Sequence, residues 1–139
     1  MSVAADGLLD TSTVILLTRL SDTSHLPTHP AISAITLAEL SVGPLVVDDP
    51  DERAARQAHL QQAEADFEPI PFDAAAARVF GRVASALRSS GRKRTARAFD
   101  ALIASVAIAH DLPLYTVNPE DFGGIGELEL VAVPHPEGP

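Results

Sequence analysis

Short, almost continuous apolar runs alternate along the chain with longer segments that carry apolar residues at every third or fourth position. The runs are typical of strands buried on both faces, and the sequence predicts them at residues 7–9, 31–35, 68–71, 112–118 and 127–133. The longer segments predict helices over residues 11–20, 36–42, 52–67, 73–90 and 96–110. This alternation of strand and helix predicts an α/β fold with a parallel sheet covered on both faces.

Polar residues and glycines mark where these helices begin and end. Thr11 or Ser12 is predicted to cap the first helix. Thr36 followed by Glu39 has the spacing of a capping box, in which the two side chains bond each other's backbone N–H groups. Gly91 is predicted to end the fourth helix. Each of these residue types therefore has an ordinary structural explanation.

Asp100 fits this pattern least well. It lies in the apolar segment 98–109, where the other polar residue is Ser105. A helix that is apolar all round is buried, and an ionised carboxylate in a core is unfavourable unless it is paired. Arg97, three residues earlier, offers an ion pair at helical spacing. The sequence leaves open whether Asp100 serves this pair or binds a ligand.

Several acidic and amide residues are predicted to meet at one edge of the sheet, since ligands of parallel sheets bind beyond the carboxyl ends of the strands. Taken singly, Asp10 suits a helix cap, and Asn118 and Asp121 suit a turn. Taken together with Glu39 and Asp100 they form a cluster, and two carboxylates about 4 Å apart repel by roughly 4 kcal/mol at an effective dielectric constant of 20. A hard divalent cation such as Mg²⁺ relieves this repulsion. We therefore predict that Asp100 ligates a metal ion.

The composition is that of a single soluble domain, with 139 residues, 46% hydrophobic and 21% charged. No linker divides residues 1–139, and we expect a core over about 7–133 and a frayed tail at 134–139. The chain has no cysteine, which excludes disulfide and thiolate chemistry and makes the cytoplasm the expected compartment. No apolar run approaches the about 20 residues needed to span a membrane, and the start lacks the pattern of a secretion signal.

The net charge of −9 argues against a nucleic-acid partner until its distribution is considered. Half of the ten basic residues fall within ten positions, and none follows Arg97. This basic segment consists of Arg88, Arg92, Lys93, Arg94 and Arg97. It is either a solvated connection between helices or a patch that contacts phosphates, because phosphate binding depends on local Lys and Arg density.

Three fragments in this order resemble PIN-domain ribonucleases: LLDTSTVI, ISAITLAELSVG and FDALIASVAIAHDLPLYTVNPEDF. Within that family the sequence is similar to the VapC toxins of bacterial toxin–antitoxin pairs, from about Gly7 to Val133. The long DALIA helix that leads into LPLYTVNPEDF is the specific part of the resemblance. It implies a PIN-like three-layer α/β/α sandwich with a central parallel sheet, an acidic pocket that holds Mg²⁺ or Mn²⁺, and endonuclease cleavage of RNA.

The resemblance also assigns expected roles to individual residues. Asp10, Glu39 and Asp100 fall on the three central acidic positions and would ligate the metal. Asn118 falls where many relatives carry a fourth acid, which leaves a second metal ion open, and Asp121 would assist through water. The residues implied to line the pocket or to hold RNA phosphates are Thr11, Ser12, Thr116, Arg92, Lys93, Arg94 and Arg97. The metal would activate a water for in-line attack on phosphorus, which yields a 5′-phosphate and a 3′-hydroxyl.

Relatives of this kind imply a homodimer and a VapB-like antitoxin whose C-terminal segment occupies the cleft, with no membrane partner. Three alternatives stay open. One is a stand-alone PIN nuclease in RNA processing, and another is a degenerate module that binds RNA or a partner without cutting, which Asn118 favours. The third is an aspartyl phosphotransferase of the haloacid-dehalogenase kind, but Ser12 stands where that family needs a second acid.

Overall fold

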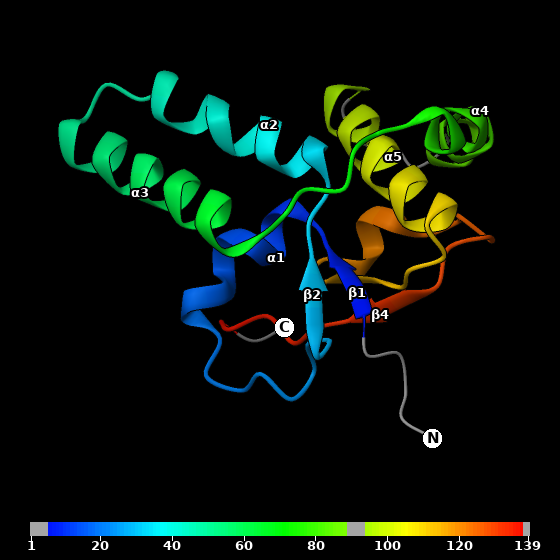
Figure 1. The fold of residues 1–139 in the computed structure, drawn as a ribbon, viewed down its shortest axis with the longest axis horizontal. Helices are drawn as coiled ribbons and strands as arrows, with labels where there is room; N and C mark the ends of the chain where they lie inside the picture. Colours follow the sequence, from blue (N-terminus) through cyan, green and yellow to red (C-terminus); the bar gives the residue numbers. More distant parts are fainter. Residues whose placement is uncertain (1–5, 89–93, 138–139) are drawn as a thin grey trace.

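A parallel four-stranded sheet forms the centre of the computed structural model, which describes residues 6–88 and 94–137. The strands are β1 (Asp6–Leu9), β2 (His29–Ala31), β3 (Leu114–Thr116) and β4 (Leu130–Ala132), in the order β2-β1-β3-β4. The predicted parallel sheet is thus confirmed, with β1 and β3 in its centre (Figure 1). The predicted strand at 68–71 is reduced to a single bridge between Ser33 and Ile70.

Successive residues of each strand face opposite sides of the sheet, and helices cover both sides. The helices are α1 (Thr11–Leu16), α2 (Ala34–Val42), α3 (Pro50–Asp66), α4 (Ala74–Arg88) and α5 (Arg94–Ala109), with short 3₁₀ turns η1 (Leu17–Arg19), η2 (Gly43–Leu45) and η3 (Pro119–Phe122). Leu8 and Leu114 belong to a core cluster with α4 and α5, whereas Leu9 and Tyr115 belong to a second cluster with α1, α2 and α3. This two-sided core confirms the three-layer α/β/α sandwich.

Of the three residues that the sequence offered as caps of the first helix, Asp10 is the one that caps α1, by accepting from Thr13 N–H. Ser33 caps α2 by accepting from Thr36 N–H, so the capping box at Thr36 is wrong. The predicted strand at 31–35 ends early because Ser33 already turns the chain into the helix.

α4 and α5 pack against each other (Figure 1). Asp73 caps α4 and also pairs with His110 Nε2 at 3.2 Å, which joins the start of α4 to the end of α5. Gly91, the predicted helix stop, lies outside the described residues. On α5 the predicted burial is confirmed from Ala101 to Ala107, apart from half-buried Leu102.

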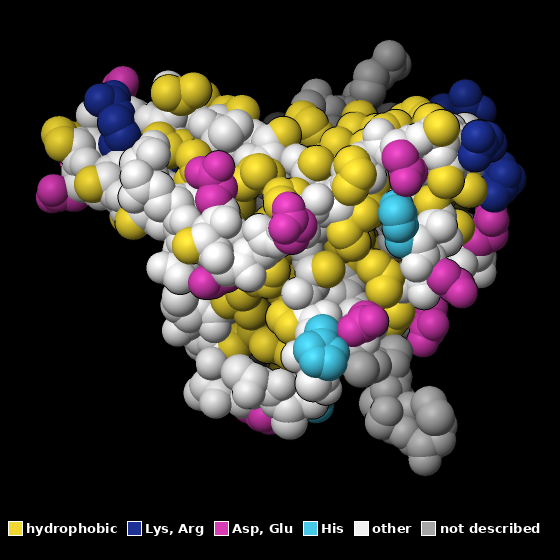
Figure 2. Space-filling model, viewed as in Figure 1, with side chains coloured by type: hydrophobic (Ala, Val, Ile, Leu, Met, Phe, Trp, Pro, Cys, Tyr) yellow, Lys and Arg dark blue, Asp and Glu magenta, His cyan; other side chains and the backbone are white. Residues whose placement is uncertain are grey.

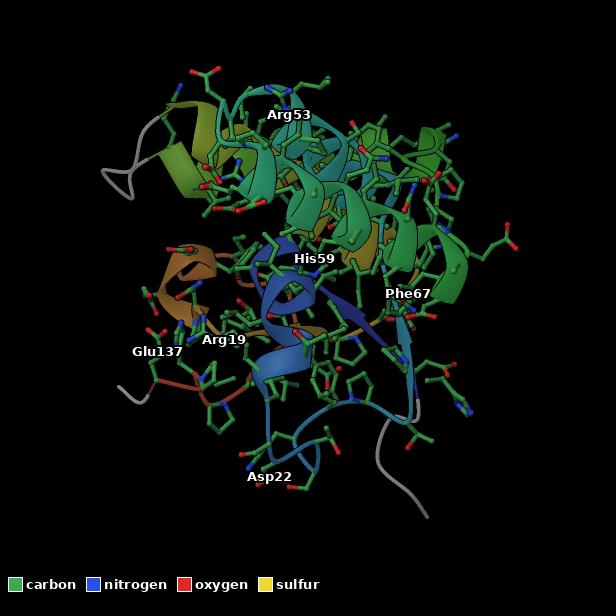
Figure 3. All side chains as sticks on the ribbon, turned by 90° about the vertical axis from the view of Figure 1, so that its left-hand side faces the viewer. Arg19, Asp22, Arg53, His59, Phe67 and Glu137 are labelled. Atoms are coloured by element: carbon green, nitrogen blue, oxygen red, sulfur yellow. The ribbon has the colours of Figure 1, made fainter. Side chains whose placement is uncertain are left out.

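Of the tail predicted at 134–139, the structure describes residues 134–137. Glu137 forms an ion pair with Arg19 of η1, and its N–H donates to His135 Nδ1. Figure 3 shows Glu137 and Arg19 side by side, so the tail lies against η1 as far as Glu137. Within the part of the chain that the structure describes, no helix combines the length and apolar character needed to cross a membrane.

Candidate active site at the carboxyl end of the sheet

Asp10 is buried, with 4% of its surface exposed, where β1 passes into α1. Its Oδ1 accepts hydrogen bonds from both the N–H and the hydroxyl of Thr13. Its Oδ2 accepts from Ser12 Oγ at 3.0 Å and from Thr116 Oγ1 at 2.7 Å. Four donors therefore fix the orientation of this carboxylate.

The end of β3 is bonded to the start of α1 by the same hydroxyl groups. Thr13 Oγ1 accepts from Val117 N–H at 3.0 Å, and Thr116 Oγ1 accepts from Asn118 N–H at 2.9 Å. Asn118 Nδ2 donates to Ser12 Oγ at 3.1 Å. The structure thus brings the predicted residues Ser12, Thr116 and Asn118 together around Asp10.

Thr13 was missed from the sequence, although it is fully buried and bonds both Asp10 and β3. The sequence signal that could have identified Thr13 is its position three residues after Asp10, because the side chain of a capping residue accepts from the backbone N–H at that spacing. The pairing with Val117 has no local sequence signal, since it joins two strand ends more than a hundred positions apart. The number of hydroxyl donors at the site was therefore underestimated.

Glu39 lies on α2 and turns toward α1. Thr11 Oγ1 donates to Glu39 Oε1 at 2.6 Å and lies 2.9 Å from Thr36 Oγ1, so the two helices are joined by a chain of hydroxyl groups. Burial raises the pKa of the Glu39 carboxyl; the Thr11 hydrogen bond opposes this shift, and the charge of Asp10 adds to it. The charge of Asp10 therefore contributes to the raised pKa of Glu39, and we refer to these two carboxylates as the acidic pair at the edge of the sheet.

Asp100 lies on α5, which packs against α2 and η3. It is half-buried, while Ile103 and Ala104, three and four positions later on the same helix face, are buried. Asp100 thus sits at the end of the buried face rather than in the core. Its role as a metal ligand stays a prediction.

Asp121 lies in η3, the turn that follows β3, where its N–H donates to Asn118 O at 3.0 Å. Asp121 is half-buried, and Asn118 is the residue that precedes η3. The supporting role through water stays a prediction.

The basic segment falls at the connection between α4 and α5. Arg88 is exposed at the last turn of α4, and Arg94 begins α5. Arg92 and Lys93 lie outside the described residues, and for Arg94 and Arg97 the backbone alone is described. On the face drawn in Figure 2, Lys and Arg side chains gather at the two ends of the molecule, over the α2–α3 turn and over α4. Acidic side chains lie between them.

The oxygen donors of this edge suit a hard cation such as Mg²⁺, which prefers carboxylates together with water. Among residues 6–88 and 94–137, no three His, Cys, Asp or Glu side chains gather closely enough to hold a metal ion by themselves. The raised pKa of Glu39 beside buried Asp10 is the electrostatic condition that a bound cation relieves. The chemistry of these oxygen donors therefore fits a metal, and Glu39 is bonded to Thr11, the residue that follows Asp10.

Comparison with known proteins identifies this arrangement. The PIN-domain family model matches residues 8–127. Ribonuclease VapC5 of Mycobacterium tuberculosis is 39% identical over 134 residues, which cover 93% of this chain and 96% of that protein. Ribonuclease VapC of Rickettsia bellii is 32% identical over 103 residues, or 74% of this chain and 75% of that protein.

A solved structure agrees with the sequence matches. The crystal structure of VapBC-5 from Mycobacterium tuberculosis, a member of the VapBC family of toxin–antitoxin systems, is similar with a TM-score of 0.76 and 37% identity. The match covers 93% of this chain and 99% of that chain. The fold and the site thus define a PIN domain, and the chain belongs to the PIN-domain family. Within that family it groups with the VapC proteins, which confirms the resemblance seen in the sequence.

Proposed function

We propose that this protein is a metal-dependent endoribonuclease that acts as the toxin of a toxin–antitoxin pair. The observation that carries the proposal is the acidic pair of Asp10 and Glu39, which comes from two separate elements and is joined through Thr11 at the carboxyl end of the sheet. Both VapC relatives are named ribonucleases, which supports RNA as the substrate. Asp100, on the neighbouring helix α5, completes the proposed set of acids.

The chain's own residues would position the reacting phosphate and the metal. Asp10 is oriented by four hydrogen bonds, two on each oxygen, so a cation that binds it would replace at least one of these donors. Thr11 orients Glu39, and Asn118 orients Ser12. Mg²⁺ or Mn²⁺ bound by Asp10, Glu39 and Asp100 would supply an activated water and neutralise charge on the phosphoryl oxygens. The basic segment at 88–97 would attract the RNA, since local cations attract phosphates on an otherwise acidic protein.

A VapB-like antitoxin and a homodimer belong to the same proposal. The similar structure from Mycobacterium tuberculosis is of VapBC-5, a member of the VapBC family of toxin–antitoxin systems, and this supports a cognate antitoxin for the present chain. An arginine entering a carboxylate pair is a physically reasonable inhibitor, because its guanidinium replaces the cation.

The proposal is tested by incubating the purified chain with a synthetic RNA in Mg²⁺, in Mn²⁺ and in EDTA. We expect cleavage with either metal, products with 5′-phosphate ends, and no cleavage in EDTA. Asp10→Asn should remove the activity, whereas Asp51→Asn, an exposed aspartate in the first turn of α3, should retain it. Equal cleavage in EDTA, or by the Asp10 variant, would refute the metal-dependent mechanism.

A further inference from the structure

A hollow of about 380 Å³ lies beside the acidic pair, between α1, α2 and α3. Thr11 and Glu39, joined by their hydrogen bond, line it on the side of the candidate active site. Arg56 and His59 line it from α3. Its volume lies within the roughly 300–1,000 Å³ of ordinary small-ligand pockets. The hollow therefore shares Thr11 and Glu39 with the proposed catalytic site and adds the basic side chain of Arg56 and the ring of His59.

Arg56 is held in place by the end of α2. Its Nη1 donates to Gly43 O at 3.2 Å, and its Nη2 donates to Glu52 Oε1 at 2.7 Å. Its stem packs on Gly43, where an added Cβ would lie 3.3 Å from Arg56 Cδ. A guanidinium carries five N–H donors in one plane, and these two contacts leave its fork able to bond an oxyanion as well.

His59 is fixed on the side of α3 that faces α1, as Figure 3 shows. Its Nε2 lies 3.2 Å from Val14 O, and this contact holds the ring at the wall of the hollow. A planar ring in such a position suits stacking against a nucleobase, an interaction that tolerates any base.

A cation beside Glu39 would reduce the electrostatic repulsion between the acidic pair and the phosphates of a bound RNA. The proposed reaction brings a phosphodiester beside Asp10 and Glu39 on a protein whose net charge is −9. The phosphates on either side of the scissile one carry one negative charge each, and they are repelled by the same acids. Arg56 is a permanent cation at the hollow next to Glu39, and it offsets this repulsion locally.

We propose that this hollow binds the nucleotide of single-stranded RNA that flanks the scissile phosphate, with Arg56 contacting its phosphate and His59 its base. The inference rests on the proposed ribonuclease function and adds two residues of α3 to the substrate site. Single-stranded RNA is the class that fits, because its bases are exposed for stacking.

The test measures binding of a labelled, mixed-sequence 12-nucleotide RNA by fluorescence anisotropy across a range of salt concentrations. Asp100→Asn serves as the background, in Mg²⁺, so that the RNA stays intact. Adding Arg56→Gln should weaken binding about tenfold at low salt and lower the slope of log K against log salt by about 0.7, the value for one phosphate contact on a single strand. Arg56→Lys should keep the slope, because it keeps the charge.

Arg53→Gln is the matched control. Arg53 lies one turn earlier on α3, bonds Val47 O through Nε and Nη2, and lines a different hollow. Its loss should leave affinity and slope unchanged. A purely structural role of Arg56 would not change the number of ions released on binding, and so it would not lower the slope.

Two further measurements separate the possible outcomes. In the otherwise native chain, Arg56→Gln should raise KM for RNA about tenfold with kcat unchanged. Ile15→Trp, at a 45% exposed position that lines the hollow, should do the same by filling it. RNA affinity and slope that stay unchanged in the Arg56 and Ile15 variants would overturn the inference. Full cleavage by Asp100→Asn in Mg²⁺ would refute the role of Asp100 in the proposed catalytic site, and the salt slope of the Arg56 variants would then be measured in EDTA.

Discussion

Thr116 Oγ1 donates a 2.7 Å hydrogen bond to Asp10 Oδ2, and this contact joins the ends of the two central strands across 106 positions of sequence. The same hydroxyl accepts from Asn118 N–H, so one buried side chain serves both the strand end and the acid. The catalytic proposal and the stability of the sheet edge therefore depend on the same residue.

Thr116→Val should lower the free energy of unfolding by about 1–3 kcal/mol, because it leaves buried Asp10 and the Asn118 N–H each short of a partner. Urea denaturation followed by circular dichroism measures this change. Thr116→Ser keeps the hydroxyl and should lower the free energy of unfolding much less. Equal losses in the two variants would show that the methyl group, and not the hydrogen bond, is what stabilises this edge.

Asp100→Asn should abolish metal-dependent RNA cleavage and leave the fold intact or slightly more stable, because it removes a negative charge from an acidic edge. Cleavage of a synthetic RNA and thermal unfolding, both in the same buffer, measure the two effects. Asp111→Asn is a suitable control, since Asp111 has a φ of 58° at which asparagine is also accepted. If Asp100→Asn cleaves at the native rate, Asp100 is not a ligand.

Glu39 should give the protein a pH-dependent loss of stability. Its pKa is raised from the ordinary 4.5, so between 4.5 and the higher folded value the folded state binds more protons than the unfolded chain. The free energy of unfolding therefore falls as the pH rises through this window, and the contribution is fully present below 4.5. In EDTA, Glu39→Gln should remove this fall, as urea denaturation from pH 4 to pH 8 would measure.

Glu127→Gln provides a control of opposite sign for that experiment. The Arg82 hydrogen bond holds the pKa of Glu127 below its ordinary value, so its contribution is present at neutral pH and is lost as the pH falls through the lowered value. The two variants should thus differ from the native chain in opposite directions at neutral pH. If both variants changed the free energy of unfolding at neutral pH in the same direction, the raised pKa of Glu39 would not explain the effect of Glu39→Gln.

Gly7→Ala should destabilise the fold by about 1–3 kcal/mol, the usual cost of overpacking a core. An added Cβ would lie 2.4 Å from Cε1 of Tyr115, a buried ring on the neighbouring strand. Gly81→Ala, on α4 with no atom within 4 Å of the added methyl, should instead stabilise by about 0.5–1 kcal/mol through helix propensity. Thermal unfolding of both variants distinguishes the two environments.

Charge reversal at Arg92, Lys93 and Arg94 should weaken RNA binding and flatten its salt dependence by about 2 in log–log slope, as expected for three lost phosphate contacts on a single strand. Anisotropy of a labelled RNA over a range of salt concentrations measures both quantities. Reversal at Arg19 and Arg82, which pair with Glu137 and Glu127, is the comparison. A slope that is unchanged by the first set places the RNA elsewhere.

The sequence alone determined the fold class, because strand runs and helical spacing are local patterns that directly reflect burial. It also pointed to Asp10, Glu39 and Asp100, since carboxylates at strand ends and in an apolar helix are costly without a partner. The sequence offered Asp10, Thr11 and Ser12 as caps of α1 without deciding among them, and it assigned the cap of α2 to Thr36 in place of Ser33. Asp, Ser and Thr neighbour one another at these helix starts, and each is able to cap. Local spacing cannot choose among them.

Tertiary structure decided the strand order and the partners of Asp10 and Glu39. Thr13 with Val117, Thr116 with Asp10 and Thr11 with Glu39 are contacts between elements far apart in sequence, and no local pattern encodes them. The hollow beside Arg56 likewise exists because α3 folds back along α1 and α2. The free energy of hydrophobic burial is roughly proportional to the apolar area buried, so the pattern of apolar residues along the chain predicts which segments are buried. A hydrogen bond between distant side chains depends instead on where the packed sheet places both atoms.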